Sequence, residues 1–261
     1  SIYGGASTGF RVFTKPSGGS SAERFRIGAD GEVILKRGGI TATPSLEIYG
    51  SGNTSNSTDA LRFHNWGNSS GDYWDICVNQ GLNGSGNGDK ITDSKKGASI
   101  RLSGKNGTVT LITSSSNSTI NEGLTQNELG HVTNSKQPYF KVHKTGRITG
   151  GGVVIWNDEV YDNGGNYDTS NGRFTAPTAG LYWFSCKINA YDRIDFWLQK
   201  NGTKIERGQY NTDSDNVGWW SNQLTTIVEM TTGQYVEVYI DNLNQNSDPG
   251  EWVTFMGYLV C

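Results

Sequence analysis

The chain contains few of the residues that build helices and few apolar residues. Alanine occurs about nine times in 261 residues, whereas glycine occurs 36 times and serine, threonine and asparagine are abundant. Glycine and the small polar residues favour turns, which excludes a mainly helical protein. Hydrophobic residues make up 34% of the chain, and this fraction leaves a monomer little material for a thick core. We therefore expect an oligomer whose missing burial comes from other copies of the chain.

Further absences exclude other classes of protein. The three cysteines, Cys77, Cys186 and Cys261, are too few and too widely spaced for a disulfide framework or a zinc cluster, so we expect free thiols. The glycines lack the Gly-X-Y period of collagen. No apolar run approaches the length of a membrane span and the first residues do not resemble a signal peptide, so we expect no membrane insertion.

The charge of the chain is small and unevenly distributed. The pI of about 5.6 argues against a surface that binds nucleic acid. Residues 1–136 carry 13 basic and 11 acidic side chains, whereas residues 137–261 carry 9 and 14. A net charge of −3 together with 11% aromatic residues argues against disorder, and the uneven distribution predicts two units.

Short antiparallel strands separated by Gly, Asn and Asp turns are predicted along the whole chain. Residues 25–35 and 100–111 each form a hairpin pattern, which suggests a weak internal repeat, and residues 61–66 and 73–78 are expected to pair. Residues 112–136 lose the pattern and are interpreted as a connector. The predicted fold class is all-β, with short-stranded structure in residues 1–111 and a jelly roll in residues 137–261. The N-terminal part is expected to form either sandwiches or interwoven trimeric sheets.

A motif in the second half resembles a known family. Residues 172–184 read Gly-Arg-Phe-Thr-Ala-Pro-Thr-Ala-Gly-Leu-Tyr-Trp-Phe, and this segment resembles the C1q-like globular domain, a relative of the tumour-necrosis-factor jelly roll. The resemblance implies a homotrimer. On that basis we expect the aromatic residues that point away from the core to meet the threefold axis, namely Trp183, Trp197, Tyr239 and Tyr258.

The first half resembles a different group of proteins. Residues 23–27 read Glu-Arg-Phe-Arg-Ile and are followed by Asp-Gly-Glu-Val at residues 30–33, a phrase similar to one in bacteriophage tail-fibre and virion proteins. The resemblance implies a virion fibre that is assembled in the host cytoplasm and contacts other virion tail proteins. The collagen stalk of animal C1q proteins and the chaperone domain that ends many phage fibres are both missing from this sequence.

No catalytic motif accompanies these resemblances. A serine-nucleophile elbow, a phosphate loop and a His-Glu-x-x-His motif are absent from the sequence. Asp213 and Asp215 supply the two carboxylates that a glycosidase needs, but carboxylates two residues apart in a polar loop are usually solvated. We expect a protein that is not an enzyme, and a polysaccharide depolymerase is the less favoured alternative.

Binding is the predicted activity, at the end of the jelly roll that lies farthest from its first and last residues. Antiparallel strands bring both chain ends of the domain together, so the opposite loops form its outermost point. Exposed aromatic rings beside amides suit a glycan, and the surface is poor in basic groups, so a neutral or cationic glycan is favoured. A host cell-surface glycan or protein is the predicted receptor, and a purely structural role is the alternative. The candidate receptor-binding residues are Tyr191, Tyr210, Asn211, Trp219, Trp220, Asn244, Asn246 and Trp252.

Carboxylates at the same end suggest a metal site. Hard oxygen ligands suit calcium, and the resemblance to the C1q-like domain implies it as well, because relatives of that domain often bind calcium. The candidate Ca²⁺ ligands are Asp192, Asp213, Asp215 and Asp248. The alternative is that these acids are simply solvated.

Overall fold

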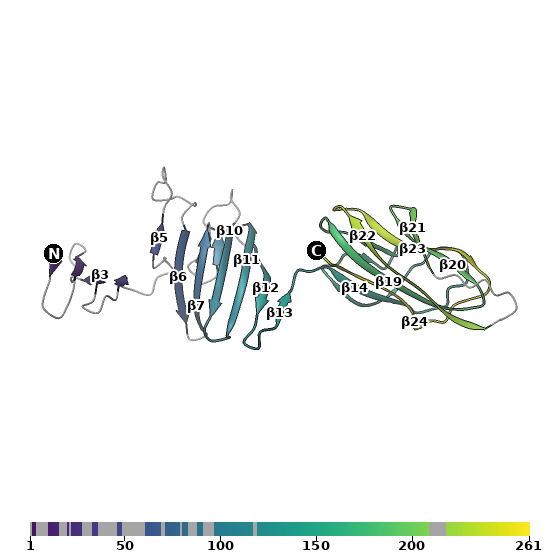
Figure 1. The fold of residues 1–261 in the computed structure, drawn as a ribbon, viewed down its shortest axis with the longest axis horizontal. Helices are drawn as coiled ribbons and strands as arrows, with labels where there is room; N and C mark the ends of the chain where they lie inside the picture. The colour runs from purple at the N-terminus through teal and green to yellow at the C-terminus, as the bar shows by residue number, and fades with distance from the viewer. Residues whose placement is uncertain are drawn as a thin grey trace. The chain divides into compact units, whose positions relative to one another are not determined.

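The computed structural model divides the chain into an N-terminal unit, Ser1–Ser135, and a C-terminal unit, Lys136–Cys261 (Figure 1). It describes residues 2–3, 10–15, 20, 22–27, 33–35, 46–48, 61–68, 71–78, 80–82, 88–90, 97–116, 119–208 and 218–261. All regular structure in these residues is strand, which confirms the predicted all-β class. The described residues include no helix long and apolar enough to cross a bilayer.

The described residues of the N-terminal unit form three sheets. Four strands pair in sequence order, β1 (Ile2–Tyr3), β2 (Phe10–Thr14), β3 (Ala22–Ile27) and β4 (Val33–Leu35). β8 (Gln80–Leu82) and β9 (Gly88–Lys90) form a small hairpin. The largest sheet has the order β13-β12-β11-β10-β7-β6-β5. Its strands are β5 (Leu46–Ile48), β6 (Leu61–Asn68), β7 (Gly71–Val78), β10 (Gly97–Ser103), β11 (Thr108–Ser116), β12 (Thr119–Gln126) and β13 (Val132–Asn134).

The strand predictions for this unit are confirmed in part. β3 pairs with β4, β6 with β7 and β10 with β11, as the turn residues between them predicted. Gly107, at the end of the β10–β11 turn, has a φ of 58°, which glycine adopts at little cost. The segment 112–136 differs from the expected connector, because most of it forms β11, β12 and β13 and pairs in the seven-stranded sheet.

The C-terminal unit is a jelly-roll sandwich of two antiparallel sheets, as predicted. One sheet has the order β16 (Asp158–Asn163), β14 (Tyr139–Lys144), β24 (Gly250–Leu259), β19 (Gly180–Tyr191) and β22 (Trp219–Met230). The other has the order β17 (Tyr167–Asp168), β18 (Arg173–Thr175), β23 (Tyr235–Leu243), β20 (Ile194–Lys200) and β21 (Thr203–Arg207), and β15 (Gly152–Val153) pairs with β23. Figure 1 shows the long strands β19, β22 and β24 running through this unit.

The core of the sandwich follows from the alternation of residues along its strands. On β19 every second side chain is buried from Tyr182 to Ala190, and on β20 Ile194, Phe196 and Leu198 are buried, as predicted. The ring of Phe140 stacks on Phe174, with their centroids 4.8 Å apart. Gly172 opens the recognised motif with a φ of 79°, and a Cβ there would lie 2.4 Å from the carbonyl oxygen of Val154. Any other residue at this position would therefore clash with the backbone.

None of the three cysteines forms a disulfide, and their burial predicts their reactivity. Cys77 and Cys186 are buried and Cys261 is exposed. Burial raises the pKa of the Cys186 thiol well above its usual range, and the thiolate is the reactive form. In the native protein at pH 8, a maleimide should label Cys261 within minutes and leave Cys186 and Cys77 unlabelled until denaturant is added. Mass spectrometry of the labelled protein tests this, and rapid labelling of Cys186 would contradict the burial.

Candidate functional site

Both ends of the C-terminal unit's chain lie at the same end of the sandwich. The Gln137 side-chain amide donates to the carbonyl oxygen of Leu259, and the amide of Leu181 donates to the carbonyl oxygen of Cys261 at 2.9 Å. β19 begins at Gly180 and ends at Tyr191, so Tyr191 lies at the other end of the sandwich. We call that end the tip, formed by residues 145–148, 189–192, 218–220 and 244–249.

An aromatic pair stands at the tip. Tyr191 and Trp219 are opposite each other in the β19–β22 register, and their rings meet edge to face with centroids 5.4 Å apart. The Trp219 side chain is 44% exposed. The guanidinium of Arg147 lies 5.3 Å from the centroid of the Trp219 ring. Trp219 is therefore held on two sides while part of its ring remains open to solvent.

The next residue, Trp220, occupies a different environment. It pairs with the buried Ala190 and is itself half-buried. Adjacent residues on a strand face opposite sides of the sheet, so the two tryptophans are separated as the sequence predicted. Trp219 is the one that a ligand can reach more fully.

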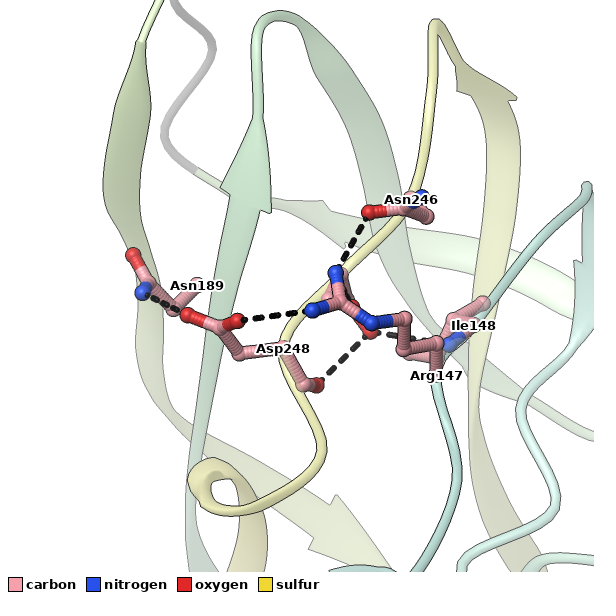
Figure 2. Close-up of polar contacts among 6 residues, drawn as sticks. Arg147, Ile148, Asn189, Asn246 and Asp248 are labelled. Carbon is pink, nitrogen blue, oxygen red and sulfur yellow. Dashed lines mark hydrogen bonds and ion pairs between the residues drawn. The ribbon is translucent and has the colours of Figure 1, made fainter.

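Arg147 connects the first loop of the tip to the last one (Figure 2). Its Nη1 donates to the Asn246 side-chain oxygen at 2.8 Å and to the Ser247 carbonyl oxygen at 3.4 Å. Its Nη2 lies 3.8 Å from an oxygen of Asp248. The nearby carboxylate offsets the positive charge of the guanidinium, and the hydrogen bonds fix the plane that faces Trp219.

Three further hydrogen bonds make the loop rigid. The Ser247 hydroxyl accepts a hydrogen bond from the amide of Ile148 at 2.9 Å and donates to the carbonyl oxygen of Asp248 at 2.9 Å. The side-chain amide of Asn189 donates to Asp248 at 2.7 Å (Figure 2). Ser247 is fully buried, and buried polar groups with satisfied partners specify a single conformation. The tip is therefore a preformed surface, which lowers the entropy lost when a ligand binds.

Asp192 has a structural role at the tip. Its φ is 64° and it is buried. Its amide donates to the carbonyl oxygen of Gly218 at 2.8 Å, and its carboxylate accepts a hydrogen bond from the side-chain amide of Asn244. These contacts fix the turn between β19 and β20.

The calcium prediction is not decided by these contacts. Among the described residues, no three His, Cys, Asp or Glu side chains gather as metal ligands. Asp248 already accepts from Asn189 and lies beside the Arg147 cation, which disfavours a second cation there. Asp213 and Asp215 lie outside the described residues, so calcium binding stays a prediction.

The structure brings together some of the predicted receptor-binding residues. Tyr191, Trp219 and Asn246 lie in one group around Arg147, and Asn244 contacts Asp192. Trp252 is exposed on β24, where the Lys187 ammonium lies 5.7 Å from its ring centroid. Tyr210 and Asn211 lie outside the described residues.

The expectation that the tip is poor in basic groups was wrong at its centre. Arg147 lies there, and Asn189 and Ser247 complete its surroundings. A signal for Arg147 was available, since residues 145–148 follow the first strand of the domain. The same alternation of strand direction that placed the other loops at the tip also places this one there.

A second exposed surface covers the outer side of the sheet that contains β14 and β19. Four neighbouring strands each contribute one aromatic ring, and we call Tyr161, Tyr139, Tyr258 and Trp183 the aromatic face. Tyr139 and Tyr161 meet at 5.6 Å and Trp183 and Tyr258 at 5.2 Å between ring centroids. The rings, with Met256 and Gln137, line a hollow of about 430 Å³.

The four aromatic residues expected at a threefold axis do not share this surface. Trp183 and Tyr258 are paired on the aromatic face, whereas Trp197 and Tyr239 are paired on the outer side of the other sheet. The Lys204 ammonium lies 5.3 Å from the Trp197 ring centroid and 5.6 Å from that of Tyr239. The side of the strand on which each residue lies was predicted correctly, but β19 and β24 belong to one sheet and β20 and β23 to the other.

Comparisons with known proteins agree with the fold of the C-terminal unit. Residues 139–260 match the family model of the C1q domain. The chain is similar to the globular domain of the zebrafish complement 1qA protein, with 17% identity, coverage of 48% of this chain and 98% of that chain, and a TM-score of 0.40. It is also similar to murine APRIL at pH 5.0, with 15% identity, 48% and 98% coverage, and a TM-score of 0.40. The Eiger TNF structure from S. frugiperda gives 12% identity, 48% and 94% coverage, and a TM-score of 0.36. No curated protein sequence matches the chain.

Proposed function

We propose that the C1q/TNF-like jelly roll of residues 139–260 is the head of a homotrimeric binding protein whose tips recognise a glycan. The observation that carries this proposal is the open ring of Trp219, held by Tyr191 and Arg147 at a preformed surface. An exposed aromatic ring stacks on the C–H face of a sugar, and the surrounding amide and carboxylate groups hydrogen-bond its hydroxyls.

The charge of the head favours a neutral or cationic ligand. Residues 137–261 carry 9 basic and 14 acidic side chains, and this net negative charge repels nucleic acid and anionic lipid. At the tip, the positive charge of Arg147 is partly offset by Asp248, 3.8 Å away. The tip is therefore polar without being strongly cationic.

The aromatic face supports the homotrimer. Tyr139, Tyr161 and Tyr258 are each more than 40% exposed, and Ile227, opposite Trp183 in the register, is 57% exposed. Contiguous apolar patches of this kind are rare on monomers and mark interaction surfaces. Three tips on one trimer would also add avidity to a weak single-site affinity.

The finer assignment, a bacteriophage virion fibre that contacts other virion tail proteins and a host receptor, rests on residues 23–33 and on the glycine-rich composition. It stays a prediction. Mass spectrometry of purified virions would detect the chain among structural proteins if the assignment is correct. A chain found only outside particles would exclude it and would leave the binding role of the head unaffected.

Replacing Trp219 with Ala should weaken glycan binding at least tenfold, because it removes the stacking surface, and tenfold corresponds to about 1.4 kcal/mol. A microarray of neutral and acidic saccharides, probed with the wild-type chain, identifies the ligand, and calorimetric titration then compares the variants. Light scattering verifies that the oligomeric mass is unchanged.

Tyr235→Ala is the matched control. This aromatic ring also lies against a guanidinium, 4.0 Å from that of Arg173, but Tyr235 begins β23 at the end of the strand far from the tip, so the affinity should stay within about twofold of wild type. Full-strength binding by the Trp219 variant would place the site elsewhere. Release of new reducing ends from the bound saccharide would instead favour the depolymerase alternative.

A further inference from the structure

The seven-stranded sheet of the N-terminal unit has its polar and apolar sides reversed. Along β10 the side chains alternate, with Ser99 and Ser103 buried and Ala98, Ile100 and Leu102 exposed. Strands in soluble proteins normally bury the apolar side and expose the polar one. β10 therefore differs from a usual strand on both sides, because its serines are buried and its apolar residues are exposed.

Neighbouring strands repeat the reversed pattern in register. Ile100 lies opposite Ile76 and Leu111, and all three belong to the same side of the sheet. The next row on that side is Leu102 with Trp74 and Val109. The reversal is therefore a property of three adjacent strands and not of one residue.

The buried side is mostly polar, with Cys77 and Ile112 beside Ser99 as its apolar members, and it is covered by the chain itself. Arg101 and Asp75 form a bidentate ion pair there, with N–O distances of 3.0 and 3.1 Å, and Thr110 lies buried beside them. β8 and β9 contact β10, β11 and β12. Since the apolar side is exposed, this hairpin covers the polar one.

The exposed side is a continuous apolar surface, which we call the apolar face. Its best-defined members are Trp74, Ile100, Leu102, Val109 and Leu111, each between 40% and 48% exposed. Leu124 on β12 is 43% exposed as well. Neighbouring strands lie about 4.8 Å apart, and each residue advances about 3.4 Å along a strand. Four strands of about six residues each therefore cover roughly 20 Å by 20 Å. A patch of this order marks an interaction site.

We infer that the apolar face packs against the same face of other copies of this chain, as a self-association surface separate from the head. Trp74, Ile100, Leu102, Val109 and Leu111 are all uncharged, so identical copies that meet across these five residues do so without like-charge repulsion. Such a surface is self-complementary, as a twofold contact between identical copies requires. Contacts between copies would bury the exposed members of the apolar face, which the described part of one copy leaves between 40% and 48% exposed.

The inference goes beyond the proposed function, because it concerns a different unit from the trimerising head. In both, the partner is another copy of this chain. The head and the apolar face would then act as two linked contacts in one assembly.

Cysteine cross-linking in the full chain tests the inference. Leu111→Cys and Ile100→Cys are made separately in a Cys261→Ser background, where Cys77 and Cys186 remain buried. Asn106→Cys, in the exposed β10–β11 turn, is the control. Mild copper–phenanthroline oxidation at micromolar protein should link most of the chains at positions 100 or 111 into disulfide dimers. The control should give at least fivefold less of this product.

Three outcomes would overturn the inference. If the thiols at positions 100 and 111 react with maleimide as fast as the thiol of the Asn106→Cys control, the face is open to solvent. Protected thiols without cross-links show that the chain's own residues cover the face. Cross-linking no greater than in the control shows only random collision. Sedimentation of the same samples separates the two proposals, because a trimer without cross-links counts against the apolar face alone, and cross-links without a trimer count against the head alone.

Discussion

A chain carrying Trp183→Asp and Tyr258→Asp should lose its trimeric state at concentrations where the wild type keeps it. The two residues are opposite each other on β19 and β24, with rings 5.2 Å apart. In the proposed trimer they are desolvated against the other copies, and an unpaired charge in such a place is strongly unfavourable. We expect at least a hundredfold weaker association, and a sedimentation mass near the 28.4 kDa of one chain at nanomolar protein.

Trp197→Asp with Tyr239→Asp is the matched control. The same two residue types are opposite each other on β20 and β23, and they lie beside the cations of Lys204 and Arg207. Aspartates placed there meet positive charge and solvent, so the trimer should persist. Dissociation of the control, with no effect from Trp183 and Tyr258, would place the interface on the opposite sheet.

The core of the head was predictable because its strands alternate strictly. β19 places Tyr182, Phe184 and Cys186 inward and Leu181 and Trp183 outward, and a period of two is the strongest sequence signal for a half-buried strand. Sequence alone could not say which sheet each strand joins. The residues that flank Trp197 alternate between apolar and polar in the same way as those that flank Trp183, yet the two tryptophans lie on opposite sheets. The sheet that a strand joins depends on pairing between residues far apart in the sequence.

The strands between residues 112 and 136 were missed for a related reason. β11 ends in Thr113-Ser114-Ser115-Ser116, which has no apolar alternation. These residues are strands because β10 pairs with Thr113 and Ser114, and β12 pairs with Ser114 and Ser116. The buried side of this sheet is mostly polar, with Ser99 and Thr110 in the interior beside Cys77 and Ile112. A pattern search that expects apolar residues inside therefore finds no signal there.

The location of the site at one end of the sandwich was predictable, but not all of its residues were. Chain direction was enough to collect Tyr191, Trp219 and Asn246 at one end of the sandwich. It did not reveal that Arg147 links them, because that contact joins positions 99 residues apart in the sequence. Long-range side-chain partners of this kind require the fold.

Arg101→Ala should destabilise the N-terminal unit by about 3 kcal/mol or more, because it removes the bidentate hydrogen bonds and the positive charge that stabilise the buried Asp75 carboxylate. The Arg101 guanidinium donates two hydrogen bonds to Asp75, and the two side chains are only 14% and 9% exposed. Exposed ion pairs contribute far less, about 0 to 1 kcal/mol. Calorimetric melting of the full chain should show this loss in the transition of the N-terminal unit while the transition of the head stays in place.

Two further variants identify the cause of that loss. Lys105→Ala removes a positive charge from the exposed turn next to β10, so it should change the free energy of unfolding by no more than about 0.5 kcal/mol. Arg101→Met combined with Asp75→Leu removes both charges and should recover much of the stability lost by Arg101→Ala, because buried ion pairs are replaceable by apolar residues of similar size. If Arg101→Ala melts like Lys105→Ala, the polar side of the sheet is hydrated instead of buried. The covering role of β8 and β9, and with it the reversed sheet, would then be wrong.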